Sequence, residues 1–164
     1  MAFTVKMIHG RHTRLEVFND GHLKLGGKDE DFALFSCGGI RWDQMRLLGQ
    51  YWGWIPKGCM SSLGNDEPRY DRLDYSPSSW NGENEYKTVA AEDASALGKA
   101  LELFLEHSIY LNDEFSKISC PASIEKGGLA MAKYELLVKE LSPGLIKKFI
   151  EFVFKGEFIF VWDD

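Results

Sequence analysis

Cysteine is scarce in this chain of 164 residues, and its three cysteines are odd in number. Cys37, Cys59 and Cys120 show no Cys-x-x-Cys spacing. Such a set argues against a disulfide framework and against a structural zinc site built on cysteines. We therefore expect buried free thiols and a cytoplasmic protein.

Long apolar runs are also missing. No segment approaches the roughly 20 continuous apolar residues that a membrane-spanning helix needs. The first sixteen residues, MAFTVKMIHGRHTRLE, contain no uninterrupted apolar core followed by a small-residue cleavage site. The sequence therefore predicts a protein without membrane association.

Basic residues are fewer than acidic ones: the chain has 19 Lys and Arg, 25 Asp and Glu, and a formal net charge of −6. The longest basic cluster is Lys147-Lys148, and phosphate contact needs a basic stripe. The glycines around Lys28 fit no phosphate-loop spacing. We therefore expect no nucleic-acid partner, whereas an acidic chain leaves a basic protein partner open.

Strand patterns stand at the two ends of the chain. Asp20-Gly21 separates two alternating runs in 14–25, which predicts a β-hairpin, and residues 3–8 also alternate. The final run, 157–162, is short, aromatic and β-branched, which is typical of a buried strand. If that strand lay at a sheet edge, edge pairing could build a dimer, so the oligomeric state stays open.

Helical patterns fill the remainder of the chain. Apolar spacing predicts helices over 42–51, 90–107 and 129–141, and Ser142-Pro143 predicts the start of another that Gly156 ends. Together with the strands, these helices predict one α+β domain over 1–164, in which three to four helices cover one face of a small antiparallel sheet. The side chains expected to face inward are Ala94, Leu97, Leu101, Phe104 and Leu105 in one helix, Met131, Leu137, Val138 and Leu141 in the next, and Leu145, Ile146, Phe149, Ile150 and Val153 in the last.

A long polar stretch interrupts the pattern between 61 and 87. It is rich in Ser, Asn, Asp, Gly and Pro and carries interleaved aromatic residues. Loops of this length are uncommon in a compact domain and tend to be functional or mobile. The alternative is a surface excursion whose aromatic side chains fold back onto the core.

Several scattered motifs resemble those of a group of small uncharacterised bacterial proteins. The motifs are a Gly-Trp-x-Pro-x-Gly turn at 53–58, a Val-x-x-x-Asp-Ala helix start at 89–94 and a closing Phe-x-x-Phe-x-x-x-Gly run from 149. Three positions depart from the pattern: Cys59 stands for a threonine, Ala90 for a capping serine and Glu157 for a glycine. The resemblance implies a single-domain fold and supplies no site or activity.

Catalytic and metal-binding signals are weak. Cys37 precedes Gly38-Gly39 and a helix start, where a thiol can have a lowered pKa and backbone amides can hold an oxyanion. No histidine can be placed beside it from sequence, and the glycines are equally a flexible entry to the helix. His9 and His12 have a ligand-like spacing without a third ligand, and surface histidines explain them as well. We expect no metal and no cofactor.

Aromatic residues provide the candidate binding surface, because Trp and Tyr bury large areas at little entropic cost. For two of these residues, Trp52 and Trp54, a place in the hydrophobic core is the alternative. The candidate binding residues are Trp52, Trp54, Tyr70, Tyr75 and Trp80.

Three functions remain open at this point. The first is an acidic cytoplasmic protein-binding module, of the immunity or accessory type, that occupies a basic partner. The second is a small enzyme that uses Cys37 or a histidine. The third is a small-ligand binder with a pocket lined by Phe149, Phe152 and Trp162, although an apolar core predicts the same three residues.

Overall fold

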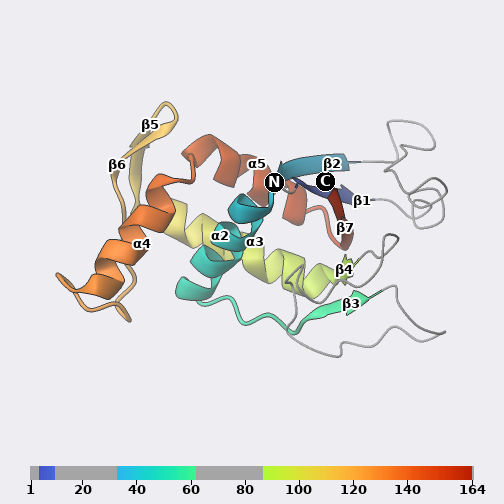
Figure 1. Cartoon of the computed structure of the whole chain (residues 1–164), viewed down its shortest axis with the longest axis horizontal. Helices are drawn as coiled ribbons and strands as arrows, with labels where there is room; N and C mark the ends of the chain where they lie inside the picture. Colours follow the sequence, from blue (N-terminus) through green and yellow to red (C-terminus); the bar gives the residue numbers. More distant parts are fainter. Residues whose placement is uncertain (1–3, 10–32, 62–86, 164) are drawn as a thin grey trace.

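The computed structural model describes residues 4–9, 33–61 and 87–163, and these ranges contain four helices and seven strands (Figure 1). In chain order the elements are β1 (Thr4–His9), β2 (Ala33–Gly38), α2 (Gly39–Tyr51), β3 (Cys59–Ser61), β4 (Lys87–Val89), α3 (Ala91–His107), β5 (Ile109–Leu111), β6 (Glu114–Lys117), α4 (Leu129–Lys139), α5 (Pro143–Val153) and β7 (Phe158–Asp163).

Five strands form one antiparallel sheet in the order β2-β1-β7-β4-β3. β7 lies in the middle, where Phe160 is opposite Met7 of β1 and Lys87 of β4. The predicted α+β fold with a small antiparallel sheet is therefore confirmed, as are the strands near both ends of the chain. Because β7 is paired along both sides, its edge is not open for the dimer considered above. The hairpin predicted at 14–25 lies outside the described residues.

The helix predictions are confirmed within a few residues at each end. In α3 all five side chains expected to face inward are buried, and the charged residues between them are exposed. α5 begins after Ser142, whose Oγ accepts a hydrogen bond from the amide of Leu145 at 3.1 Å. α4 buries Val138 as predicted, and it also buries Tyr134, which the pattern did not single out. No described helix has the combination of length and apolar composition that a membrane span requires.

The core between the sheet and the helices contains a cluster of aromatic side chains. Trp42 of α2 contacts Phe149 of α5 at 5.8 Å and Phe160 of β7 at 5.3 Å between ring centroids. Phe152 contacts Phe158 at 5.1 Å. Phe149 and Phe152 are thus packed core residues, which removes two of the three residues suggested for a ligand pocket; the side chain of Trp162 is not described.

A second sheet consists of β5 and β6 alone, and the sequence patterns above do not predict it. The hairpin stands away from the five-stranded sheet, beside α4 (Figure 1). Its turn contains Asn112 with φ of 58°, and Asp113 accepts a hydrogen bond from the amide of Gly144 at 2.8 Å. Through this bond the hairpin is held against the first turn of α5, and Tyr110 of β5 is brought close to that helix.

Candidate functional site

The turn at 53–58 is tied to the start of α3 by one carboxylate. Asp93 is buried, and its oxygens accept hydrogen bonds from the amides of Lys57, at 2.9 and 3.1 Å, and Gly58, at 3.1 Å. The Trp54 Nε1 donates to the Asp93 carbonyl at 3.1 Å. Two of the motifs that carry the resemblance therefore form one structural unit. The hydrogen bonds within this unit pair its polar groups with one another, so the unit stabilises the fold.

The two candidate tryptophans of this segment differ in their surroundings. Trp54 is only 3% exposed, which confirms the core interpretation and leaves it no surface for a partner. Trp52 is half-buried, donates from Nε1 to the Tyr134 hydroxyl at 2.9 Å, and stacks on His107 with 5.8 Å between ring centroids. His107 lies in the last turn of α3, where the helix dipole favours a basic residue. Tyr70, Tyr75 and Trp80 lie outside the described residues.

The Tyr134 hydroxyl extends this contact into a partly buried chain of hydrogen bonds. It donates to the Ser119 carbonyl at 2.6 Å, and the Ser119 amide donates to the Ser108 hydroxyl at 3.1 Å. Burial raises the pKa of Tyr134 well above its usual value, so the hydroxyl stays protonated and can keep donating. The chain of bonds links the ends of α2 and α3 to α4, and it gives Trp52 a positioning role in the fold.

Cys37 lies in β2 opposite Val5 of β1, on the side of the strand that also carries the buried Phe35. Burial raises the pKa of the Cys37 thiol to about 12, so the lowered pKa considered for this residue is wrong. A thiol of this kind is protonated near neutral pH and is a poor nucleophile.

We predict that iodoacetamide labels Cys37 slowly in the folded protein. At pH 8 the thiolate fraction is on the order of one in ten thousand, compared with about one in four for a thiol of unperturbed pKa. Peptide mass spectrometry of samples quenched over time measures the rate at this position. The matched control is the same protein in urea, where the rate should rise at least about 100-fold. Equal rates in the two samples would contradict the burial of this thiol.

Metal sites are not indicated by the part of the chain that the structure describes. No three His, Cys, Asp or Glu side chains there are grouped so that they could hold an ion. His12 and His22 lie outside these ranges, and only the backbone of His9 is described.

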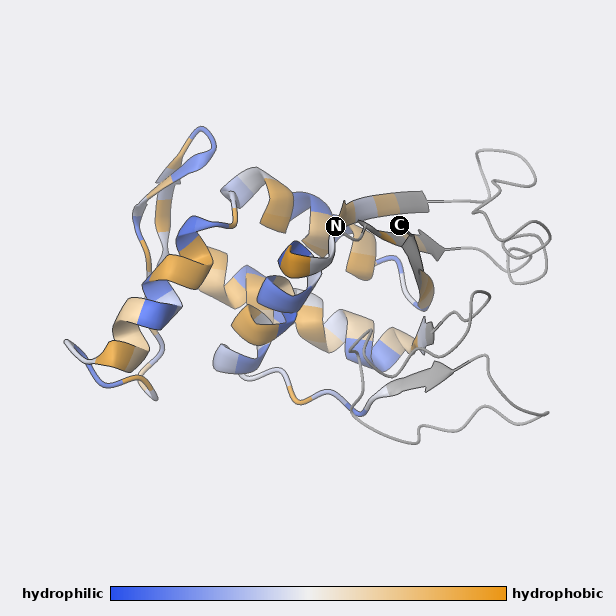
Figure 2. Cartoon of the chain, in the orientation of Figure 1, coloured by the Kyte–Doolittle hydropathy of each residue, from blue (hydrophilic) through white to orange (hydrophobic). Residues whose placement is uncertain are grey.

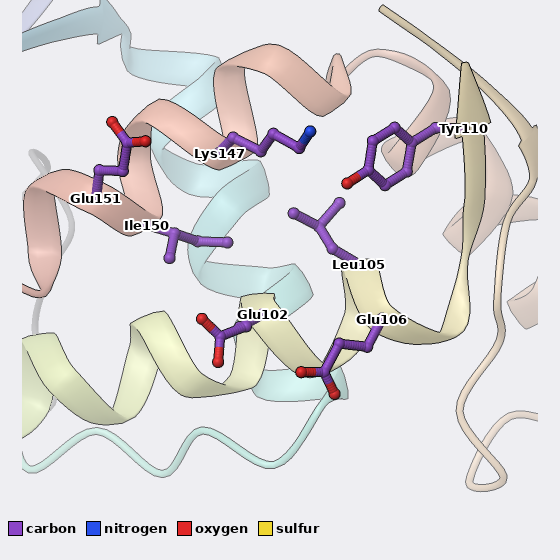
Figure 3. A pocket seen from close by; sticks show the side chains of 7 residues that line it. All are labelled: Glu102, Leu105, Glu106, Tyr110, Lys147, Ile150 and Glu151. Atoms are coloured by element: carbon purple, nitrogen blue, oxygen red, sulfur yellow. The ribbon is translucent and has the colours of Figure 1, made fainter. Parts of the chain in front are cut away.

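A concave surface between α3, β5 and α5 is a feature that sequence reasoning missed (Figure 3). Its volume is about 310 Å³, and buried Leu105 and Ile150 provide apolar lining. The seven lining residues are Glu102, Leu105 and Glu106 of α3, Tyr110 of β5, and Lys147, Ile150 and Glu151 of α5. We refer to these residues as the acidic pocket.

The charges of the acidic pocket are unequal. The pocket contains three exposed carboxylates and one ammonium, so its formal charge is −2. The Lys147 Nζ lies over the Tyr110 ring, 4.6 Å from its centroid, so this aromatic face already accepts a cation. The sequence contains part of the signal for this pocket, because Glu102 and Glu106 are four residues apart and so lie on one face of α3. No local pattern indicates that α5 lies beside them.

The chain matches no known protein family, no characterised protein and no solved structure. The resemblance to small bacterial proteins stays a prediction.

Proposed function

We propose that this chain is an acidic protein-binding module, of the immunity or accessory type, and that a basic side chain of its partner lies in the acidic pocket. The observation that carries this proposal is the arrangement of Glu102, Glu106 and Glu151 around an apolar lining. The formal charge of −6 for the whole chain supports it, because opposite charge speeds the encounter with a basic protein.

The pocket suits lysine and arginine in two ways. Their aliphatic stems can lie on Leu105 and Ile150 while their charged ends reach the carboxylates at the rim. The Tyr110 face adds a cation–π contact, which Lys147 now makes from within the chain. An uncharged apolar ligand would gain only the contact with Leu105 and Ile150. The pocket therefore favours a cation on an apolar stem.

The proposal includes action in the cytoplasm. Cys37 and Cys120, the two cysteines whose side chains the structure describes, are free thiols, which agrees with a reducing compartment. The cysteine version of the enzyme alternative loses support because burial raises the pKa of Cys37.

A double variant tests the pocket. Glu102→Gln/Glu106→Gln is expected to weaken binding of a fluorescent oligoarginine peptide at least about tenfold, measured by anisotropy at physiological salt. The matched control is Glu114→Gln/Glu125→Gln, which removes the same charge from exposed positions outside the pocket. Its affinity should fall by less than about threefold. Equal losses in the two double variants would show that only the overall charge attracts the peptide, and the pocket proposal would fail.

A further inference from the structure

The two helices of the acidic pocket contribute different charges to it. Both helices carry hydrophilic as well as hydrophobic residues along their length (Figure 2). α3 places a carboxylate three residues before Leu105 and another one residue after it, whereas α5 places Lys147 and Glu151 at the same spacing around Ile150. Among the lining residues, all of which belong to the described part of the chain, Lys147 is the one cation.

The Lys147 ammonium contacts an aromatic ring and not a carboxylate. Its Nζ lies 4.6 Å from the centroid of the Tyr110 ring, and the side chain extends along α5 toward that ring (Figure 3). Of the ion pairs between described residues, none joins Lys147 to Glu102, Glu106 or Glu151. The three carboxylates of the pocket are therefore not neutralised by a direct contact with Lys147.

The Tyr110 ring is held in place by its neighbours. It meets the edge of Phe115 at 6.0 Å between centroids, and Phe115 contacts the buried Phe104 at 5.4 Å. The turn of the hairpin is bound to α5 through the hydrogen bond from the Gly144 amide to Asp113. The aromatic face is therefore a fixed part of the pocket.

Lys147, in contrast, is exposed and can change its position easily. Its ammonium is at the end of a flexible four-carbon stem. A cation–π contact at an exposed site changes an equilibrium constant by only about two- to fivefold. A small free-energy difference is therefore enough to move the ammonium off the ring while the helix stays in place.

A basic side chain of the partner would compete with Lys147 for the Tyr110 face, and the two cations would repel each other at this distance. An acidic ligand would gain a contact with Lys147 but would be repelled by the three carboxylates. Lys147 therefore opposes a basic ligand without making the pocket suitable for an acidic one.

We propose that Lys147 is an internal competitor, which occupies the Tyr110 face in the free chain and leaves it when a basic side chain of the partner binds in the acidic pocket. This inference rests on the proposed function. It adds that a residue of the chain itself limits the affinity of the pocket, so that removal of this residue strengthens binding.

Anisotropy of a fluorescent oligoarginine peptide at physiological salt tests the competition. Lys147→Met keeps a long unbranched side chain and removes the charge, and it should lower the Kd at least about fivefold. The matched control is Lys148→Met, which removes the same charge from the next position, exposed and outside the pocket. Its Kd should change by less than about twofold. Circular dichroism checks that both variants fold.

Nuclear magnetic resonance tests the displacement itself. A methylene group above a ring face is shielded, so the ε-methylene protons of Lys147 should resonate upfield of those of Lys148 in the free chain. Tyr110→Leu should abolish this difference. Saturation of the unmodified chain with the oligoarginine peptide should also abolish it, because the ammonium then leaves the ring.

The results separate this inference from the proposed function. An unchanged or higher Kd for Lys147→Met, an equal gain for Lys148→Met, or an upfield shift that persists in the saturated complex would each overturn the role of Lys147. The proposed function would survive these results as long as Glu102→Gln/Glu106→Gln still weakens binding more than its control. If the peptide binds neither the unmodified chain nor Lys147→Met, both proposals fail.

Discussion

Replacement of Asp93 by alanine is expected to lower the free energy of unfolding by about 3 kcal/mol. The carboxylate is buried and accepts from the amides of Lys57 and Gly58. Alanine would leave both donors without this acceptor, and Gly58 is buried where water cannot replace it. The substitution also removes a negative charge from the first turn of α3, where the helix dipole favours it.

Urea unfolding followed by circular dichroism measures this loss as a lower midpoint with an unchanged slope. The neighbouring carboxylate provides the matched control, because Glu92 pairs with Lys57 at the surface and its pKa is lowered by that hydrogen bond. Glu92→Ala should shift the midpoint little, since exposed ion pairs contribute little to stability. Equal shifts for the two variants would contradict the role assigned to Asp93.

Phe149→Ala is expected to cost about 4 kcal/mol of unfolding free energy. The Phe149 side chain is fully buried and contacts Phe35 of β2 at 5.3 Å and Trp42 of α2 at 5.8 Å between centroids. Its removal takes away the hydrophobic transfer free energy of the ring and leaves a cavity where three elements meet. Rigid aromatic neighbours can fill such a cavity only in part.

Phe154→Ala is the control for this prediction, because the same side chain is removed five residues later. Phe154 is 41% exposed, so its loss should cost about 1 kcal/mol. Thermal unfolding measured by calorimetry compares the two variants, and Phe149→Ala should have the clearly lower Tm. Similar values of Tm would mean that Phe149 is not at the centre of the core.

Local patterns predicted most of the helices because their causes are local. In α3, apolar spacing alone identified the buried face, and in α5 the Ser142 cap and Pro143 identified the first turn. The final strand was recognisable because β7 is central in the sheet and buries Phe158, Ile159 and Phe160 in succession. The β5–β6 hairpin escaped prediction because its strands are short and leave most of their side chains in solvent.

Candidate site residues were harder to predict, since exposure and partners decide what a residue type does. The sequence alone does not distinguish Trp54 from Trp52. In the structure Trp54 is buried, whereas Trp52 is half-buried against His107 and Tyr134. The position of Cys37 before a helix suggested a reactive thiol, whereas its place on the core side of β2 raises its pKa.

The sequence by itself determined the α+β class and the buried faces of the helices, because periodicity and capping act over a few residues. Only the tertiary structure decided that the Asp93 carboxylate binds the amide of Lys57, 36 positions away, and that α3 and α5 lie on two sides of the acidic pocket. These sites join residues that are distant in sequence. Their proximity follows from which helices pack together, and a local pattern carries no information about that choice.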